Sequence, residues 1–122
     1  MKHLILTSSE APKSFDQTEV KGGKVHFNGY VAVLVSHGFG AGWQTWNTDV
    51  NCLFTPEVVK QVMEGTASED SLKAVYAPAR VYCGGLDGLC VKWVLRGSKF
   101  KVSEYDGAEG LEFLEEVDWQ TA

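Results

Sequence analysis

The sequence has no long apolar run, and this absence argues against a membrane-spanning protein. No stretch approaches the roughly 18 apolar residues of a membrane span. The longest candidate, residues 30–35, lies between Gly29 and Ser36. The one early apolar stretch, residues 4–6, is too short for the core of a signal peptide. We therefore expect a soluble, cytoplasmic protein without a membrane partner.

Cysteine is scarce as well, with three residues in a chain of 122 and no C-x-x-C pair. An odd number of cysteines without a secretion signal argues against a disulfide framework, so reduced thiols are expected. The histidines are scattered relative to Cys52, Cys83 and Cys90, whereas a metal site needs clustered ligands. The sequence thus predicts neither a metal site nor a bound cofactor.

Lysine and arginine are missing from the C-terminal part of the chain. Residues 104–122 contain seven acidic side chains, and because the whole chain carries −5, the remainder carries +2. Nucleic acid is not the expected partner, since its phosphates would be repelled there. Such a stretch is usually a solvated face, and the alternative is a surface that complements a basic patch on a protein partner. The residues of that surface would be Glu112, Glu115, Glu116 and Asp118.

The length and a hydrophobic content of 44% are typical of a single domain with one core, spanning residues 1–122. Residues 25–35 are apolar at both parities, which predicts a strand that is buried on both faces at the centre of a sheet. The Gly22-Gly23 pair just before this strand indicates a tight hairpin. Residues 17–20 would then pair back as an edge strand.

The clearest helix signal is Thr55-Pro56, because threonine can cap the exposed amides and proline fits the first helical position. Four apolar residues follow along one stripe, and Gly65 is expected to end the helix in the left-handed conformation. A second, shorter helix would begin after Ser68 and end before Pro78.

The last third of the sequence returns to strand patterns. A short strand is expected at residues 80–83, and two longer ones at 91–95 and 100–102, joined through residues 96–98. An Asp-Gly turn then leads to a last strand at residues 111–114. Together the patterns predict an α+β fold, in which a mainly antiparallel sheet is covered by one main helix and a second short helix.

The most unusual segment is residues 36–47, where three alternating glycines follow the expected central strand. Alternating glycines leave backbone amides approachable, so such a loop can wrap an anion or a planar ligand that stacks on a tryptophan. The spacing matches neither the dinucleotide G-x-G-x-x-G pattern nor a P-loop. The structural alternative, which the frequency of buried aromatics favours, is a crossover whose tryptophans fill the core. The candidate ligand-binding residues are Ser36, His37, Gly40, Gly42, Trp43, Thr45, Trp46 and Asn47.

No motif commits the chain to catalysis. His37 could act as a base to Cys52 or Ser36, but no third residue that would orient it is identifiable, so a structural or exposed histidine is favoured. Asp87 and Asp106 precede glycines, as turn residues do, and this weakens their use as a carboxylate pair. We therefore expect a binding protein rather than an enzyme, with no catalytic residue.

Two segments resemble small uncharacterised bacteriophage proteins. Residues 91–109, VKWVLRGSKFKVSEYDGAE, resemble the C-terminal part of those proteins, and residues 40–47, GAGWQTWN, are similar to an upstream Gly-Trp-x-Thr-Trp-Asn pattern. The resemblance implies a phage origin and a location in the cytoplasm of the host cell, and it assigns no functional residue. Short phage accessory proteins often counter host defence by binding, so the resemblance also implies an inhibitor or antagonist.

Two hypotheses of function follow. In the first, the chain is a phage accessory protein that antagonises a host defence or regulatory system by contacting a host protein through its acidic C-terminal part. In the second, the loop at residues 36–47 binds a small nucleotide-like ligand, which it sequesters or, less favourably, converts. The oligomeric state is left open, and a homo-oligomer is compatible with either hypothesis.

Overall fold

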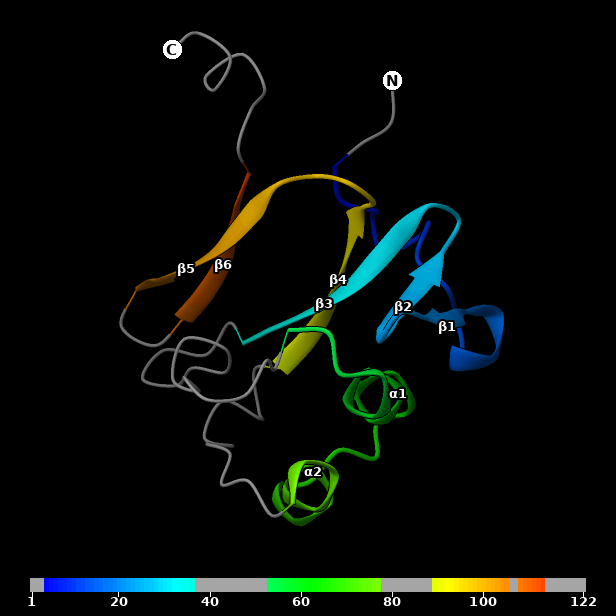
Figure 1. Ribbon diagram of the computed structural model, residues 1–122, viewed down its shortest axis with the longest axis vertical. Coiled ribbons are helices and arrows are strands. Elements are labelled where there is room, and N and C mark those ends of the chain that lie inside the picture. Colours follow the sequence, from blue (N-terminus) through cyan, green and yellow to red (C-terminus); the bar gives the residue numbers. More distant parts are fainter. Residues whose placement is uncertain (1–3, 37–52, 78–88, 106–107, 114–122) are drawn as a thin grey trace, which may run out of the picture.

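The computed structural model describes residues 4–36, 53–77, 89–105 and 108–113. It has an α+β architecture, with a four-stranded antiparallel sheet, two helices on one side of that sheet and a separate two-stranded sheet (Figure 1). The predicted fold class is therefore confirmed. The elements are η1 (Phe15–Gln17, a 3-10 helix), β1 (Glu19–Lys21), β2 (Lys24–Phe27), β3 (Tyr30–Ser36), α1 (Pro56–Glu64), α2 (Glu69–Tyr76), β4 (Leu89–Leu95), β5 (Phe100–Tyr105) and β6 (Ala108–Phe113).

The single strand predicted at residues 25–35 is in fact two strands, β2 and β3. They are joined by a tight turn in which Asn28 has φ 49° and Gly29 has φ 87°. An Asn-Gly pair is the strongest local signal for a hairpin of this kind, because both residues tolerate the left-handed conformation. The turn also changes the face assignment: Val25 shares its face with Leu34, not with Val33 as an unbroken strand would require.

The four strands are arranged in the order β1-β2-β3-β4, and all neighbours are antiparallel. The Gly22-Gly23 hairpin between β1 and β2 and the edge position of β1 are confirmed. The pairing of β3 with β4 is the longest in the sheet, and every residue of each strand takes part in it. Beyond β4, Ile5 forms an antiparallel bridge with Val94.

Helix α1 has the predicted extent, but its start is stabilised differently. The carbonyl of Thr55 accepts the amides of Val58 (3.1 Å) and Val59 (3.0 Å), and the threonine hydroxyl makes no capping bond to the helix. That hydroxyl instead accepts a 2.7 Å hydrogen bond from the hydroxyl of Tyr76, at the end of α2. The expected side-chain cap at Thr55 is therefore wrong. The predicted stop at Gly65 is confirmed by its φ of 72°.

Helix α2 begins after Ser68, as the sequence predicted, and its start is stabilised by a reciprocal cap that the sequence analysis did not predict. The Ser68 hydroxyl oxygen accepts the amide of Ser71 (3.1 Å), and the Ser71 hydroxyl oxygen accepts the amide of Ser68 (2.8 Å). The Ser71 hydroxyl also donates to the side-chain carbonyl of Gln61 (2.6 Å), which links α2 to α1. On the exposed side, a 2.8 Å bond from Lys73 lowers the pKa of the Glu69 carboxyl.

The main core lies between the sheet and the two helices. Trp93 of β4 contacts Phe27 edge-on, with ring centroids 6.1 Å apart, and Leu72 of α2 is fully buried. Burial of this continuous apolar surface is the main contribution to stability expected for such a layer. The buried members of the cluster are Val25, Tyr30, Ala32, Leu34, Val58, Val59, Leu72, Leu89 and Trp93.

A second, smaller core lies on the opposite face of the sheet. Strands β5 and β6 pair with each other and, among the described strands, with no other. Residues 96–98 join β4 to β5 as predicted, yet the two strands belong to different sheets. The β5–β6 hairpin places its apolar side against part of the four-stranded sheet. This cluster consists of buried Val33, Val35 and Val94, with Leu53, Phe54, Cys90, Phe100, Val102, Leu111 and Phe113 packed around them.

The short strand expected at residues 80–83 lies outside the described residues. Among the residues that are described, no helix has the length and apolar character needed to cross a membrane.

Candidate functional site

The loop predicted to bind a ligand begins at Ser36, which is the last residue of β3 and is fully buried. The other seven candidates lie outside the described residues: His37, Gly40, Gly42, Trp43, Thr45, Trp46 and Asn47. The described residues on either side of the loop do meet. The amide of Leu34 donates to the carbonyl of Leu53 over 2.8 Å, so the chain that leaves β3 returns to the same strand.

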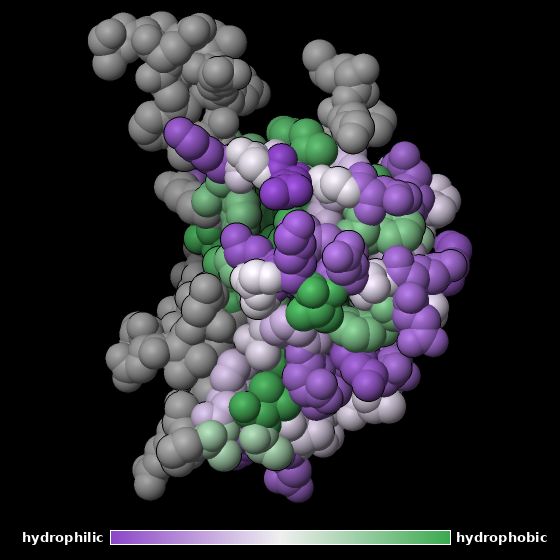
Figure 2. All heavy atoms as spheres, turned by 45° about the vertical axis from the view of Figure 1, so that its right-hand side comes forward, coloured by the Kyte–Doolittle hydropathy of each residue, from purple (hydrophilic) through white to green (hydrophobic). Residues whose placement is uncertain are grey.

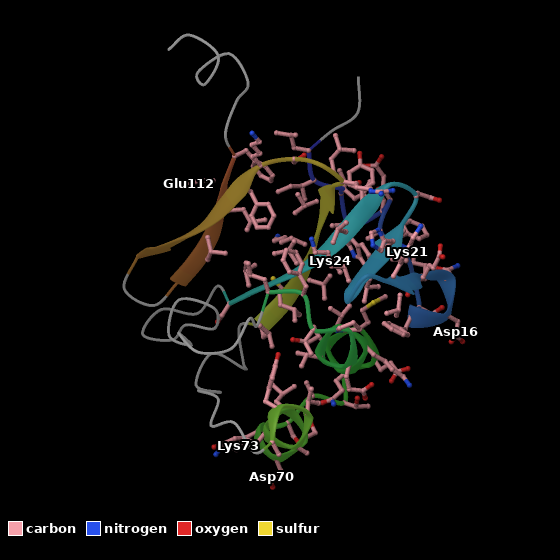
Figure 3. All side chains as sticks on the ribbon, viewed as in Figure 1. Asp16, Lys21, Lys24, Asp70, Lys73 and Glu112 are labelled. Carbon is pink, nitrogen blue, oxygen red and sulfur yellow. The ribbon has the colours of Figure 1, made fainter. Side chains whose placement is uncertain are left out.

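The acidic surface is represented in the described structure by Glu112 of β6. Its neighbours Leu111 and Phe113 pack into the second core, so strand alternation directs the Glu112 side chain outward, and it is exposed. Figure 3 shows Glu112 on the β5–β6 side of the molecule, well separated from Lys21 and Lys24. The other predicted contact residues, Glu115, Glu116 and Asp118, lie outside the described residues.

A third feature, which the sequence did not indicate, is a polar hollow of about 360 Å³ beside β1 and β2. Figure 2 turns this side of the molecule toward the viewer and shows hydrophilic side chains gathered over it. The wall includes Phe27 and both residues of the Asn28-Gly29 turn. The other lining residues are Gln17, Thr18, Glu19, Lys21, His26 and Arg96.

Strand alternation explains why these side chains gather on one face. Val20 is aligned with Val25, and Val25 belongs to the main core on the helix side. The residues on either side of Val20, Glu19 and Lys21, therefore point to the opposite face, as does His26, the partner of Glu19. The β5–β6 hairpin packs over the valines of β3 and β4, and the hollow lies beside β1 and β2.

Two hydrogen bonds to backbone carbonyls hold the hollow in shape. The Nε2 atom of His26 is 3.1 Å from the carbonyl oxygen of Lys21, and because a carbonyl only accepts, Nε2 carries the proton. The backbone amide of Arg96 donates to the carbonyl of Gly29 over 2.9 Å. This second bond fixes the end of β4 beside the β2–β3 turn, so Arg96 borders the hollow together with residues that are distant in the sequence.

Among the described residues, the hollow is lined by two cations, Lys21 and Arg96, and one carboxylate, Glu19. Within the described ranges, neither Lys21 nor Arg96 forms an ion pair with a carboxylate. A lysine ammonium and an arginine guanidinium in one hollow form a donor set suited to an anion with several oxygens. The arrangement is thus chemically able to bind an anionic group.

A smaller hollow of about 70 Å³ adjoins the first and shares Arg96 with it. Its walls are largely apolar, and the ammonium of Lys24 lies over the ring of Phe54, 4.4 Å from the centroid. This cation–π contact holds the Lys24 ammonium against Phe54, which belongs to the second core. Lys24 is therefore assigned to packing rather than to the larger hollow.

Nucleophilic and metal chemistry have little support in the described part of the chain. Burial raises the pKa of the Cys90 thiol, and the nearby charge of Lys92 offsets only part of that rise. A thiol with a raised pKa holds its proton at neutral pH, so it is a poor nucleophile. No three side chains of His, Cys, Asp or Glu gather closely enough in the described ranges to hold a metal ion.

Comparison with known proteins gives no assignment, because no family model, no curated protein and no solved structure matches the chain. The sites described above therefore have to be interpreted from their own geometry and charge.

Proposed function

We propose that this protein acts by binding a protein of a host cell, in the manner of a small phage accessory protein that antagonises a host defence or regulatory system. The observation that carries the proposal is the outward position of Glu112. Leu111 and Phe113 of strand β6 pack into the second core, and the Glu112 side chain between them is exposed, so a partner can reach it.

The charge of the surrounding sequence supports a cationic partner. Glu112 belongs to residues 104–122, which contain seven acidic and no basic side chains. A surface of one sign steers an oppositely charged protein during encounter, and the resulting association rate falls as salt screens the charges. A basic patch on the host protein is the complementary surface that this proposal requires.

The proposal is tested by neutralising charge in two places. One variant carries Glu112→Gln, Glu115→Gln and Glu116→Gln, and the matched control removes three charges from the helices: Glu57→Gln, Glu64→Gln and Asp70→Asn. Parent and variants are used to capture partners from a bacterial lysate, and association rates with the captured partner are measured at several salt concentrations. We expect the acidic-surface variant to associate about tenfold more slowly at low salt, with a flatter salt dependence.

The control variant should keep the parent rate, because it loses the same charge at a different place. Equal association rates for parent and acidic-surface variant at low salt would contradict the proposal. Equal slowing in both variants would show that only the net charge of the protein matters, which contradicts it as well.

A second candidate function is the binding of a small nucleotide-like ligand by the loop at residues 36–47. The hydrogen bond between Leu34 and Leu53 favours it, because a loop whose ends are held together can present approachable amides to a ligand. Base stacking on an aromatic ring contributes about 1–3 kcal/mol, so the loss of one tryptophan should weaken binding roughly tenfold or more.

The variants Trp43→Ala and Trp46→Ala test this candidate. We expect at least one of them to stay folded by circular dichroism and to lose the small molecule that mass spectrometry recovers from the denatured parent protein. A ligand recovered with unchanged mass indicates sequestration, and an altered mass indicates an enzyme. The loop is not the site if both variants unfold, or if both stay folded and retain the ligand.

A further inference from the structure

The polar hollow beside β1 and β2 is separate from both candidates above. Glu112 lies on the β5–β6 side of the molecule, whereas Lys21 lies on β1 (Figure 3). Ser36, the one described residue of the loop at residues 36–47, is not among the described residues that line the hollow. We propose that this hollow binds a small organic phosphate, with the phosphate group held between Lys21 and Arg96.

The charges favour a phosphate over a neutral ligand. A phosphate monoester carries about −1.5 to −2 charges at neutral pH and presents three acceptor oxygens. Lys21 supplies a compact ammonium and Arg96 supplies a fork of donors that fits two oxygens of one phosphate. Neither side chain forms an ion pair with a described carboxylate, so within the described part of the chain no carboxylate competes directly with the phosphate for these two cations.

The size and lining of the hollow point to a ligand larger than phosphate alone. A volume of about 360 Å³ is within the range of small-molecule sites. Two polar side chains in the wall each make one hydrogen bond within the protein. The Gln17 side-chain carbonyl oxygen accepts the backbone amide of Lys13 (2.7 Å), and the Thr18 hydroxyl donates to the backbone carbonyl of Phe15 (2.6 Å). The Gln17 amide group therefore remains a donor, and the Thr18 oxygen remains an acceptor, for the organic part.

One residue of the hollow opposes the proposed ligand. Glu19 stands directly opposite His26 in the β1–β2 register, so its carboxylate borders the place where the phosphate would lie. Like charges repel, and removal of this carboxylate should strengthen phosphate binding. Removal of a cation of the hollow should therefore weaken phosphate binding, and removal of Glu19 should strengthen it. A general loss of structure would weaken binding in every variant.

The experiment is a calorimetric titration at fixed low ionic strength with three probes: AMP, inorganic phosphate and adenosine. The variants are Lys21→Gln, Arg96→Gln and Glu19→Gln, and the matched control is Lys73→Gln. Lys73 is a cation of α2, far from Lys21 in Figure 3, and it pairs with Glu69. Circular dichroism verifies that each variant is folded, which is expected because these side chains are exposed.

We expect saturable binding of AMP and none of adenosine. Lys21→Gln and Arg96→Gln should each weaken AMP binding about tenfold or more, since a hydrogen bond to a charged group is worth about 1.5–3 kcal/mol. Glu19→Gln should tighten binding severalfold, and Lys73→Gln should leave it unchanged. Tighter binding of AMP than of inorganic phosphate assigns the hollow to an organic phosphate.

Four outcomes overturn the proposal. They are the absence of saturable AMP binding, equal binding of adenosine and AMP, equal binding of inorganic phosphate and AMP, and equal weakening by Lys73→Gln and Lys21→Gln. The last of these would show attraction by net charge and no localised site. The proposal is independent of the host-protein hypothesis, because the variants used here leave the acidic surface intact.

Discussion

The two faces of the four-stranded sheet carry different residues on the same strands. On the helix side, Val25 and Trp93 are buried beneath α1 and α2. On the other face, the β5–β6 hairpin packs over the valines of β3 and β4, and the polar hollow lies beside β1 and β2. One face therefore provides most of the hydrophobic stabilisation, and the other has room for recognition.

Strand β2 shows the difference within four residues. Val25 is fully buried in the main core, and its neighbour His26 faces the hollow. A strand that alternates in this way can be changed on its polar side with little effect on its apolar side. The comparison predicts that side chains of the hollow can be changed with little effect on folding, whereas changes on the helix side destabilise the fold.

The largest effect is expected on the helix side, from Trp93→Ala. Truncating a buried aromatic leaves a cavity and costs about 3–5 kcal/mol. The control is Glu19→Ala, because Glu19 is exposed on the opposite face and its loss should alter stability by less than about 0.5 kcal/mol. The measurement is the denaturation midpoint in urea. Similar losses for both variants would contradict the difference between the faces.

A smaller effect is expected at the contact between the two helices. Tyr76→Phe removes the donor of the hydrogen bond to Thr55, and Thr55→Val removes its acceptor. Each change should cost about 1 kcal/mol, the usual net value of such a bond. A double-mutant cycle checks it: because both single changes remove the same bond, the double variant should lose less stability than the sum of the two single variants. Additive losses would show that the hydroxyls do not interact.

The smallest effect is expected at the hollow. Lys21→Gln and Arg96→Gln should each change the free energy of unfolding by less than about 0.5 kcal/mol in phosphate-free buffer, because both side chains are exposed and neither pairs with a described carboxylate. Thermal unfolding followed by circular dichroism gives the comparison with the parent. A loss at Arg96 as large as that at Trp93 would make Arg96 a structural residue and remove the contrast between the faces.

The elements that the sequence predicted correctly depend on local signals. The end of α1 at Gly65, the start of α2 at Ser68 and the Gly22-Gly23 hairpin each depend on the conformational preferences of a few adjacent residues. The Asn28-Gly29 turn carried an equally local signal. It was missed because apolar residues continue on both sides of it, so the hydrophobic pattern resembled one long strand.

The features that the sequence did not indicate depend on contacts between distant residues. Arg96 joins Lys21 in the hollow only because β4 pairs with β3 and the Arg96 amide bonds to Gly29. The assignment of β5 to a second sheet depends likewise on packing against Val33 and Val94. The Thr55 hydroxyl has a local explanation as a cap, but a partner from α2 competes for it. None of these three contacts can be predicted from the spacing of residues in the sequence.

The pairing of β3 with β4 has a consequence for how the chain folds. Its register runs from Tyr30 with Leu95 to Ser36 with Leu89, and both helices lie between these strands in the sequence. Strands β1 to β3 are joined by tight turns and can form early, whereas their union with β4 closes a long loop and is entropically costly. During synthesis, we expect the edge of β3 that pairs with β4 to stay unpaired until β4 has left the ribosome.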